Sequence, residues 1–166
     1  MLTGGASRRM GRTKADIEVD GVAMADRVGA ALARAGALAV ARIGDDVPDL
    51  HPGAGPLGGV LTALRWSAEQ VTVVAPCDLV EPDPASFRLL VDALLAGADL
   101  AAVPSRDVPL PLALRAGATT ALAGRFAAGE RSLRAALREL AVVTVDLPAT
   151  ALADADTPEE LPPGAR

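Results

Sequence analysis

Aromatic residues are almost absent from this 166-residue sequence, which contains two Phe, one Trp and no Tyr. Proteins that bind single-stranded nucleic acid usually stack the bases on aromatic side chains. The formal net charge is −5, whereas a nucleic-acid-binding domain usually carries a basic excess. The sequence therefore predicts no nucleic-acid partner.

Cysteine and long apolar runs are also scarce. Cys77 is the only cysteine, so an internal disulfide is excluded and a reducing compartment is the default. No apolar run approaches the ~18 residues typical of a membrane-spanning helix, and the N-terminus lacks the features of a signal peptide. We therefore expect a cytoplasmic protein with no membrane partner.

Hydrophobic residues make up 51% of the sequence, and a chain of this length buries roughly 70% of its unfolded surface. Neither a repeat nor a long linker divides it. We therefore expect one domain over residues 1–166.

Short β-like runs alternate with helical patterns along the chain. The predicted strands cover residues 37–43, 71–75, 100–103 and 142–145, and the predicted helices cover residues 24–35, 57–68, 84–95, 119–128 and 132–140. Such alternation favours βαβ units, and hence an α/β fold with a mostly parallel sheet and helices on both faces. A small hairpin is predicted around Asp20-Gly21.

The N-terminal region contains a glycine-rich basic string, Thr3-Gly4-Gly5-Ala6-Ser7-Arg8-Arg9-Met10-Gly11-Arg12-Thr13-Lys14. Glycines such as Gly4 and Gly5 let the backbone turn tightly, so that N–H groups converge on phosphate oxygens. Arg9 and Lys14 add charge-assisted donors. A turn with solvated arginines is the alternative, but the whole string favours phosphate binding. Its spacing matches neither the Walker loop nor the dinucleotide fingerprint.

A glycine loop in an α/β fold normally follows a full strand, and here only Met1 and Leu2 precede Thr3. We expect Leu2 and Thr3 to form the stub of a central strand. The loop must leave the sheet at its carboxyl edge, where ligands bind in open α/β sheets.

Asp78 directly follows the predicted strand over residues 71–75. A carboxylate at the end of a strand can hold Mg²⁺ together with triphosphate oxygens. The alternative is that Asp78 caps the next helix. The adjoining Cys77 has no evident histidine partner, so we expect a packed residue rather than a nucleophile.

Two further segments are rich in glycine or acid. Glycines in Gly53-Ala54-Gly55-Pro56-Leu57-Gly58-Gly59 suit either a close approach to a ligand or tight helix packing. Asp49, upstream of them, either accepts hydrogen bonds from a nucleotide base or ribose, or is a solvated loop acid. Near the C-terminus a capping box explains residues 157–160. The capping box does not explain Asp154 or Asp156. Either residue supplies a second carboxylate near the metal, or both are simply exposed acids in a loop.

Together these four segments resemble the molybdenum cofactor guanylyltransferases, within the nucleoside-triphosphate transferases, and they run collinearly over nearly the whole chain. The resemblance implies a three-layer Rossmann-like fold and transfer of GMP from GTP onto molybdopterin bearing molybdenum. The nucleotide contacts of the family carry over to Leu2, Thr3, Gly4 and Lys14 and its metal-binding aspartate to Asp78. Its acidic residue before Gly-Pro-Leu carries over to Asp49.

The resemblance also implies partners: GTP, Mg²⁺, a molybdopterin-type phosphorylated acceptor, and a molybdoenzyme or cofactor-insertion protein. The sequence departs from the family pattern at Thr13, where Asp is frequent, and at Asp154 and Asp156, where the family has Asn. These departures bear on base choice and activity. The alternatives are an enzyme that uses CTP or another triphosphate on a different phosphorylated acceptor, and a non-catalytic nucleotide-binding or partner-binding domain.

Overall fold

The computed structural model describes residues 1–3, 14–155, 161 and 165. Its elements are, in chain order, the 3-10 helix η1 (Lys14–Asp16), β1 (Glu18–Val19), β2 (Val22–Ala23), α1 (Met24–Arg34), α2 (Gly55–Trp66), β3 (Val71–Val74), α3 (Pro84–Ala96), β4 (Ala101–Val103), β5 (Leu112–Arg115), α4 (Ala118–Ala127), α5 (Leu133–Leu137), β6 (Val142–Thr144) and α6 (Ala149–Leu152). Among the described residues, no helix has the length and apolar character to cross a membrane.

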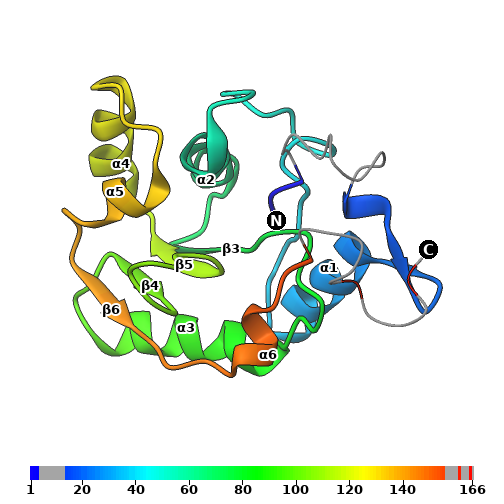
Figure 1. Ribbon diagram of the computed structural model, residues 1–166. Coiled ribbons are helices and arrows are strands. Elements are labelled where there is room, and N and C mark those ends of the chain that lie inside the picture. Colours follow the sequence, from blue (N-terminus) through cyan, green and yellow to red (C-terminus); the bar gives the residue numbers. More distant parts are fainter. Residues whose placement is uncertain (4–13, 156–160, 162–164, 166) are drawn as a thin grey trace.

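The main sheet has the order β3-β5-β4-β6 (Figure 1). Strand β5 runs antiparallel to both of its neighbours, and β6 runs parallel to β4. Consequently β3, β4 and β6 all point the same way, and β5 alone reverses. The prediction of a mostly parallel sheet therefore holds for the strand directions, with one antiparallel strand inserted.

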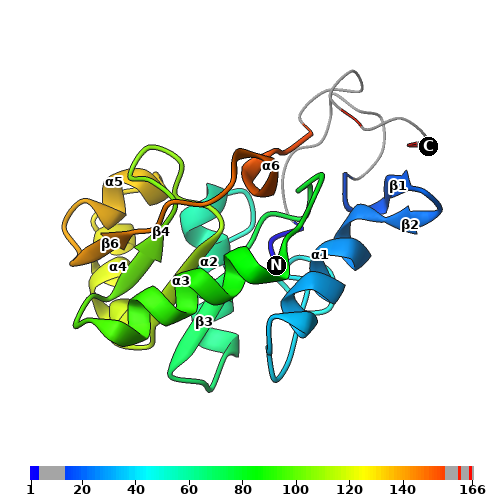
Figure 2. The same ribbon diagram turned by 90° about the horizontal axis from the view of Figure 1, so that it is seen from below.

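Helices cover both faces of this sheet (Figures 1 and 2). Leu112 and Leu114 of β5 pack with α2, α4 and α5, whereas Ala113 packs with Leu90 and Leu94 of α3. Alternate residues of one strand thus enter two different apolar layers, as the pleat of a strand requires. The predicted three-layer arrangement is confirmed.

Local sequence signals located most elements to within a few residues. The hairpin forms at Asp20 and Gly21, whose φ angles of 54° and 77° are those of a tight turn. Strand β5 was not predicted, because Pro109 and Pro111 made its surroundings look like a loop. Its residues are buried all the same, since β5 lies between two other strands.

The first three residues form the predicted stub of a central strand. Leu2 bridges Ile43 on one side and Pro76 on the other, both in parallel. The Leu2 N–H donates to the Ala75 carbonyl (2.9 Å), and the Ile43 N–H donates to the Met1 carbonyl (2.9 Å). The stub therefore joins the segment around Ile43 to the end of β3.

The buried strand predicted over residues 37–43 is wrong for most of its length. Residues 37–40 are exposed and are not part of a strand, and only Ile43 takes part in pairing. The stub is too short to pair with all of this segment, because its hydrogen bonds to the segment begin only at Ala41. An apolar, strand-like sequence does not form a strand without a partner to pair with.

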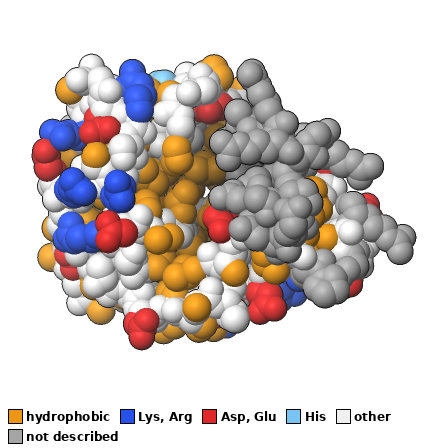
Figure 3. Space-filling view, viewed as in Figure 1, with side chains coloured by type: hydrophobic (Ala, Val, Ile, Leu, Met, Phe, Trp, Pro, Cys, Tyr) orange, Lys and Arg blue, Asp and Glu red, His pale blue; other side chains and the backbone are white. Residues whose placement is uncertain are grey.

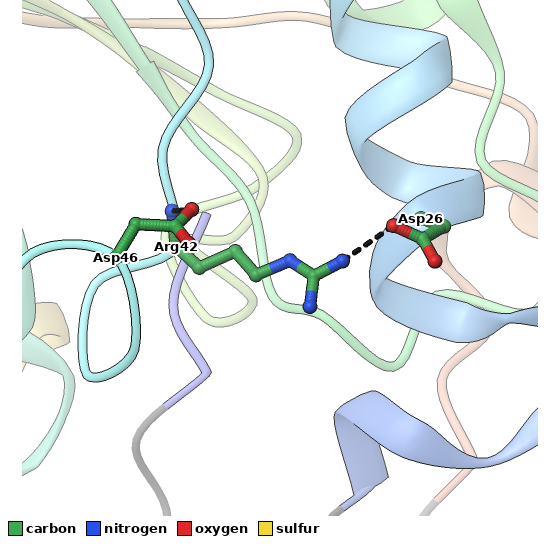
Figure 4. A network of polar contacts seen from close by, with 3 residues as sticks. All are labelled: Asp26, Arg42 and Asp46. Atoms are coloured by element: carbon green, nitrogen blue, oxygen red, sulfur yellow. Dashed lines mark hydrogen bonds and ion pairs between the residues drawn. The ribbon is translucent and has the colours of Figure 1, made fainter.

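Arg42 fastens the paired end of this segment to its surroundings (Figure 4). Its guanidinium forms an ion pair with Asp26 of α1. Its backbone N–H donates to the Asp46 carboxylate (3.0 Å), which closes the following turn. Residues 41–43 are thereby held against both the stub and α1.

The amino group of Met1 is buried at the beginning of the stub. Met1 is 7% exposed, and its ammonium donates to the Ala41 carbonyl (2.7 Å). Burial lowers the pKa of this amino group from its ordinary 8.0 to about 6, against smaller opposite effects from Cys77 and Asp46. The charged form is thus disfavoured in the folded chain.

This burial predicts a pH dependence for the chain that begins at Met1. Between pH 8 and 6 the unfolded chain binds more protons at this amine than the folded chain does, so stability falls as the pH falls. A shift from 8.0 to about 6 corresponds to a loss on the order of 2–3 kcal/mol. Urea unfolding from pH 5.5 to 8.5 measures it. An N-acetylated chain should lack this component, and identical slopes for the two chains would contradict the assignment.

Candidate active site

The stub and β3 end at the same edge of the sheet. Because Leu2 pairs in parallel with Pro76, Thr3 and Asp78 both follow the pair on the same side. Thr3 is buried, and its Oγ1 donates to the Ile43 carbonyl (2.8 Å). Thr3, the last residue before the glycine-rich string, is therefore anchored at the edge of the sheet where Asp78 lies.

Several predicted site residues lie outside the described part of the chain. Gly4, Gly5 and Arg9 belong to residues 4–13, and Asp156 also lies outside the described residues. The backbone of Lys14 begins η1, which packs against α1. The structure thus places the two ends of the string, at Thr3 and at Lys14.

Asp78 is half-buried just beyond β3. It does not cap the next helix, which was the alternative. Asp83 does so: its carboxylate accepts hydrogen bonds from the backbone N–H groups of Ala85 (3.1 Å) and Ser86 (2.9 Å). The Ser86 hydroxyl also donates to Asp83 (2.7 Å), and these hydrogen bonds hold the pKa of Asp83 below its ordinary value. Cys77 is buried among apolar side chains, in accordance with the packed role that we expected.

A segment near the C-terminus lies beside Asp78. Asp154 forms an antiparallel bridge with Leu79, and the Ala155 N–H donates to the Asp78 carbonyl (3.1 Å). The Val80 N–H donates to the Ala153 carbonyl (2.9 Å) on the other side of the bridge. The fold therefore brings together two acidic residues that are far apart in the sequence.

The oxygen donors at this edge suit a hard cation. Within the described residues, no group of three or more His, Cys, Asp or Glu side chains could hold a metal ion. Mg²⁺ does not require such a group, because it commonly binds one or two protein carboxylates together with water and substrate phosphates. Asp78 supplies one such carboxylate, and its binding of Mg²⁺ stays a prediction.

Glycines in α2 allow close packing next to the stub. A Cβ on Gly59 would lie 2.9 Å from Leu2 Cδ2, and a Cβ on Gly58 would lie 2.9 Å from His51 Cβ. Real Cβ contacts are essentially never this short. Tight packing, one of the two interpretations of this segment, is therefore confirmed for Gly58 and Gly59, and α2 holds Leu2 in place.

Asp49 fastens its loop to α2. Its Oδ1 accepts hydrogen bonds from the Thr62 hydroxyl (2.8 Å) and from the His51 N–H (2.9 Å). The Leu50 N–H in turn donates to Thr62 Oγ1 (3.1 Å). Asp49 is therefore more than a solvated loop acid, and its contact with a nucleotide stays a prediction.

Sequence reasoning missed a basic residue near the start of α2. The Arg131 guanidinium stacks on the Phe126 ring, with 4.0 Å to the ring centroid, and the His51 ring lies 4.5 Å from that of Phe126. The Arg131 carbonyl oxygen is 3.7 Å from where a Cβ on Gly55 would lie. No local signal could reveal the complete cluster, because His51 is far in the chain from Phe126 and Arg131. Figure 3 shows one face of the molecule, on which apolar side chains line a hollow beside a flank rich in charged residues.

Comparisons with known proteins agree with this arrangement. The sequence model of the MobA-like NTP transferase domain matches residues 1–145. The chain is 34% identical over 175 residues to a molybdenum cofactor guanylyltransferase of Xanthomonas euvesicatoria pv. vesicatoria (strain 85-10), with 96% of this chain and 89% of the relative covered. It is 30% identical over 173 residues to the protein of that name from Rhodobacter capsulatus, with 97% and 90% covered.

A solved structure shares the fold. The crystal structure of molybdopterin-guanine dinucleotide biosynthesis protein A from Archaeoglobus fulgidus superimposes with a TM-score of 0.72 at 24% identity, covering 96% of this chain and 92% of that one. The fold and the relatives together confirm the family resemblance read from the sequence motifs. The chain belongs to the MobA-like NTP transferase family, together with the molybdenum cofactor guanylyltransferases, and is a nucleotidyltransferase.

Proposed function

We propose that this chain transfers GMP from GTP onto the terminal phosphate of a molybdopterin-type acceptor. The observation that supports the proposal is the parallel pairing of Leu2 with Pro76, after which Thr3, the residue before the glycine-rich string, and Asp78 follow at one edge of the sheet. The guanylyltransferase names of two relatives that align over nearly the whole chain supply the base and the acceptor.

The reaction brings one anion against another. An oxygen of the acceptor phosphate attacks the α-phosphorus of GTP and forms a new P–O–P linkage. The bond from the α-phosphorus to the oxygen that bridges it to the β-phosphorus breaks, and its electron pair leaves with pyrophosphate. Positioning and charge stabilisation supply nearly all the catalysis in such transfers. The acceptor is already ionised near neutral pH, so no side-chain nucleophile is needed.

The residues divide this work between them. Leu2 and Thr3 anchor the string, and the backbone N–H groups of Gly4 and Gly5 are proposed to bind phosphate oxygens. Arg9 and Lys14 would neutralise charge on the triphosphate. Asp78 would hold Mg²⁺, which stabilises negative charge on the phosphates when bound.

Other parts of the proposal depend on the family names alone. Asp49 would contact the base or ribose while its Oδ1 stays bonded to Thr62 and to the His51 N–H. Contact with a molybdoenzyme or a cofactor-insertion protein, and a cytoplasmic location, remain predictions.

Pyrophosphate release tests the reaction and the base together. The chain is incubated with Mg²⁺, the acceptor and each of the four nucleoside triphosphates in turn. We expect release that needs both GTP and the acceptor. Release with CTP alone would indicate an enzyme for a related acceptor. No release with any triphosphate, from a folded protein that binds GTP, would indicate a non-catalytic domain.

Replacing Asp78 with Asn tests the metal assignment. The change removes a charge and keeps the shape, so we expect transfer to fall at least about 100-fold while the melting temperature changes little. Asp92→Asn, at an exposed position on α3, is the matched control and should retain activity. Near-normal Mg²⁺-dependent turnover of Asp78→Asn would refute the assignment.

Lys14→Ala tests which phosphates the basic string binds. An ammonium at the end of the string would meet the outer phosphates, so GTP binding should weaken by about 10- to 100-fold and GMP binding much less. Calorimetric titrations with both nucleotides measure the difference, and Arg34→Ala at the end of α1 is the control. An equal loss for GTP and GMP would assign Lys14 another role.

A further inference from the structure

The loop that carries Asp49 lies at the active-site edge of the sheet. It begins after Ile43, whose carbonyl oxygen accepts hydrogen bonds from the N–H (3.0 Å) and the hydroxyl (2.8 Å) of Thr3. It ends at α2, which leads back toward the beginning of β3. The segment around Ile43 runs parallel to the stub, and the stub runs parallel to the end of β3. The loop and the first turn of α2 therefore lie at the edge where Asp78 lies.

Thr62 is the only polar side chain among the buried residues of α2. It is 1% exposed, and its neighbours Leu61 and Ala63 are buried as well. A valine would fill nearly the same space, and a buried hydroxyl costs free energy unless it forms hydrogen bonds. The contribution of this hydroxyl therefore lies in the hydrogen bonds that it forms.

The Thr62 hydroxyl ties two consecutive loop residues to α2. It donates to Asp49 Oδ1 (2.8 Å) and accepts from the Leu50 N–H (3.1 Å). The Gly58 carbonyl, one turn earlier in the helix, is a second acceptor within reach (3.1 Å), as is common for threonine in helices. The hydrogen bond to the carboxylate is shorter and charge-assisted, so it takes the single hydroxyl proton.

The carboxylate of Asp49 is held by one of its two oxygens. Oδ1 accepts hydrogen bonds from the Thr62 hydroxyl and from the His51 N–H (2.9 Å), and no hydrogen bond from the described residues reaches Oδ2. His51 belongs to the same loop as Asp49. Among the described residues, the Thr62 hydroxyl is thus the group that connects this carboxylate to another element of the fold.

A carboxylate fixed in this way is an acceptor whose direction is set before the ligand binds. An unrestrained aspartate side chain populates several rotamers, and ordering it on binding costs free energy. The hydrogen bond from Thr62 removes this cost. It also leaves a second carboxylate oxygen, with its own lone pairs, for a donor of the ligand.

We propose that Thr62 is a positioning residue of the nucleotide site. Its hydroxyl holds Asp49 by Oδ1, so that Oδ2 accepts a hydrogen bond from an N–H or O–H donor of the nucleoside part of the triphosphate. Thr62 itself acts only through Asp49. This inference rests on the proposed function, in which Asp49 contacts the base or the ribose.

Calorimetric titration of GTP into variants of the chain tests this role. Thr62→Val keeps the shape of the side chain and removes the hydroxyl, so GTP binding should weaken by about tenfold. Thr72→Val is the matched control: Thr72 is also buried, at 9% exposed, and its hydroxyl forms no hydrogen bond with the described residues. The control should bind GTP within about twofold of the unmodified chain. Equal affinities for Thr62→Val and the unmodified chain would overturn the proposal.

Thr62→Ser separates positioning from packing. Serine keeps the hydroxyl and loses the methyl group, so its melting temperature should fall while its GTP affinity stays within about threefold of the unmodified chain. Thr62→Ala lacks both groups, and it repeats the loss of affinity if Thr62→Val does not fold. Titrations are made well below all the melting transitions. An affinity that follows the melting temperature rather than the hydroxyl would assign Thr62 a structural role and overturn the proposal.

A double-mutant cycle with Asp49→Asn tests whether Thr62 acts through Asp49. Asparagine can turn an N–H group toward the donor of the ligand, so Asp49→Asn should weaken GTP binding by about 10- to 100-fold. Adding Thr62→Val to Asp49→Asn should then weaken it by less than about threefold further, because the positioned group is already lost. Losses that add in full would overturn the proposal.

The same titrations distinguish the two sources of the donor. With 2′,3′-dideoxy-GTP, which lacks the ribose hydroxyls, Thr62→Val should have no effect if Oδ2 accepts from the ribose. It should have its full effect if Oδ2 accepts from the base. Either result supports the positioning role and identifies the donor.

Failure of this inference is distinguishable from failure of the proposed function. Weaker GTP binding by Asp49→Asn but not by Thr62→Val would overturn the role of Thr62 alone. Unchanged binding by Asp49→Asn would overturn the nucleotide contact of Asp49 and the role of Thr62 together. An unmodified chain that binds no GTP would refute the proposed function as well.

Discussion

The parallel pairing of Leu2 between Ile43 and Pro76 is the interaction on which this structure depends. It joins the segment after α1 to the end of β3, and it sets the direction in which the chain leaves the sheet at Thr3. Few hydrogen bonds support it, namely those of Met1, Leu2, Thr3 and Ile43. Packing supplies the rest, since Leu2 lies against Gly59 of α2 and Met1 lies in the cluster between α1 and α3.

The same pairing has different consequences at its two ends. At the carboxyl end Thr3 and Asp78 follow the pair on the same side of the sheet, and Asp154 is paired with Leu79. This is the edge at which we propose that the nucleotidyl group is transferred. At the amino end the pairing stops at Ala41, and an apolar groove follows. The two ends of one short strand thus lead to different regions, Asp78 at one end and the apolar groove at the other.

Much of this could be predicted from the sequence, because local signals determine it. The β-branched run at residues 71–74 and the turn at Asp20-Gly21 required no knowledge of distant residues. Residues 37–40 show the limit: their composition favours a strand, but a strand also needs a partner. Strand β5 shows the reverse, since its position between β3 and β4 outweighs the prolines before it.

The candidate site likewise has features that the sequence predicts and features that only the fold reveals. The position of Asp78 after β3 could be read from the sequence, whereas the helix cap at Asp83 needed its hydrogen bonds to be seen. The Arg131–Phe126–His51 cluster joins segments that only the fold brings together. Contacts of high sequence separation leave no local pattern, so they came from the structure alone.

The most direct test of the central claim is the location of the bound metal–nucleotide. In an NMR experiment on the isotopically labelled chain, Mn²⁺ replaces Mg²⁺ in the presence of GTP and broadens the amide signals nearest to it. Our account predicts selective loss of signals from residues 3–5 and 77–79, while signals from residues 37–40 at the opposite end of the sheet persist. Broadening centred elsewhere, with the signals of residues 77–79 intact, would contradict it.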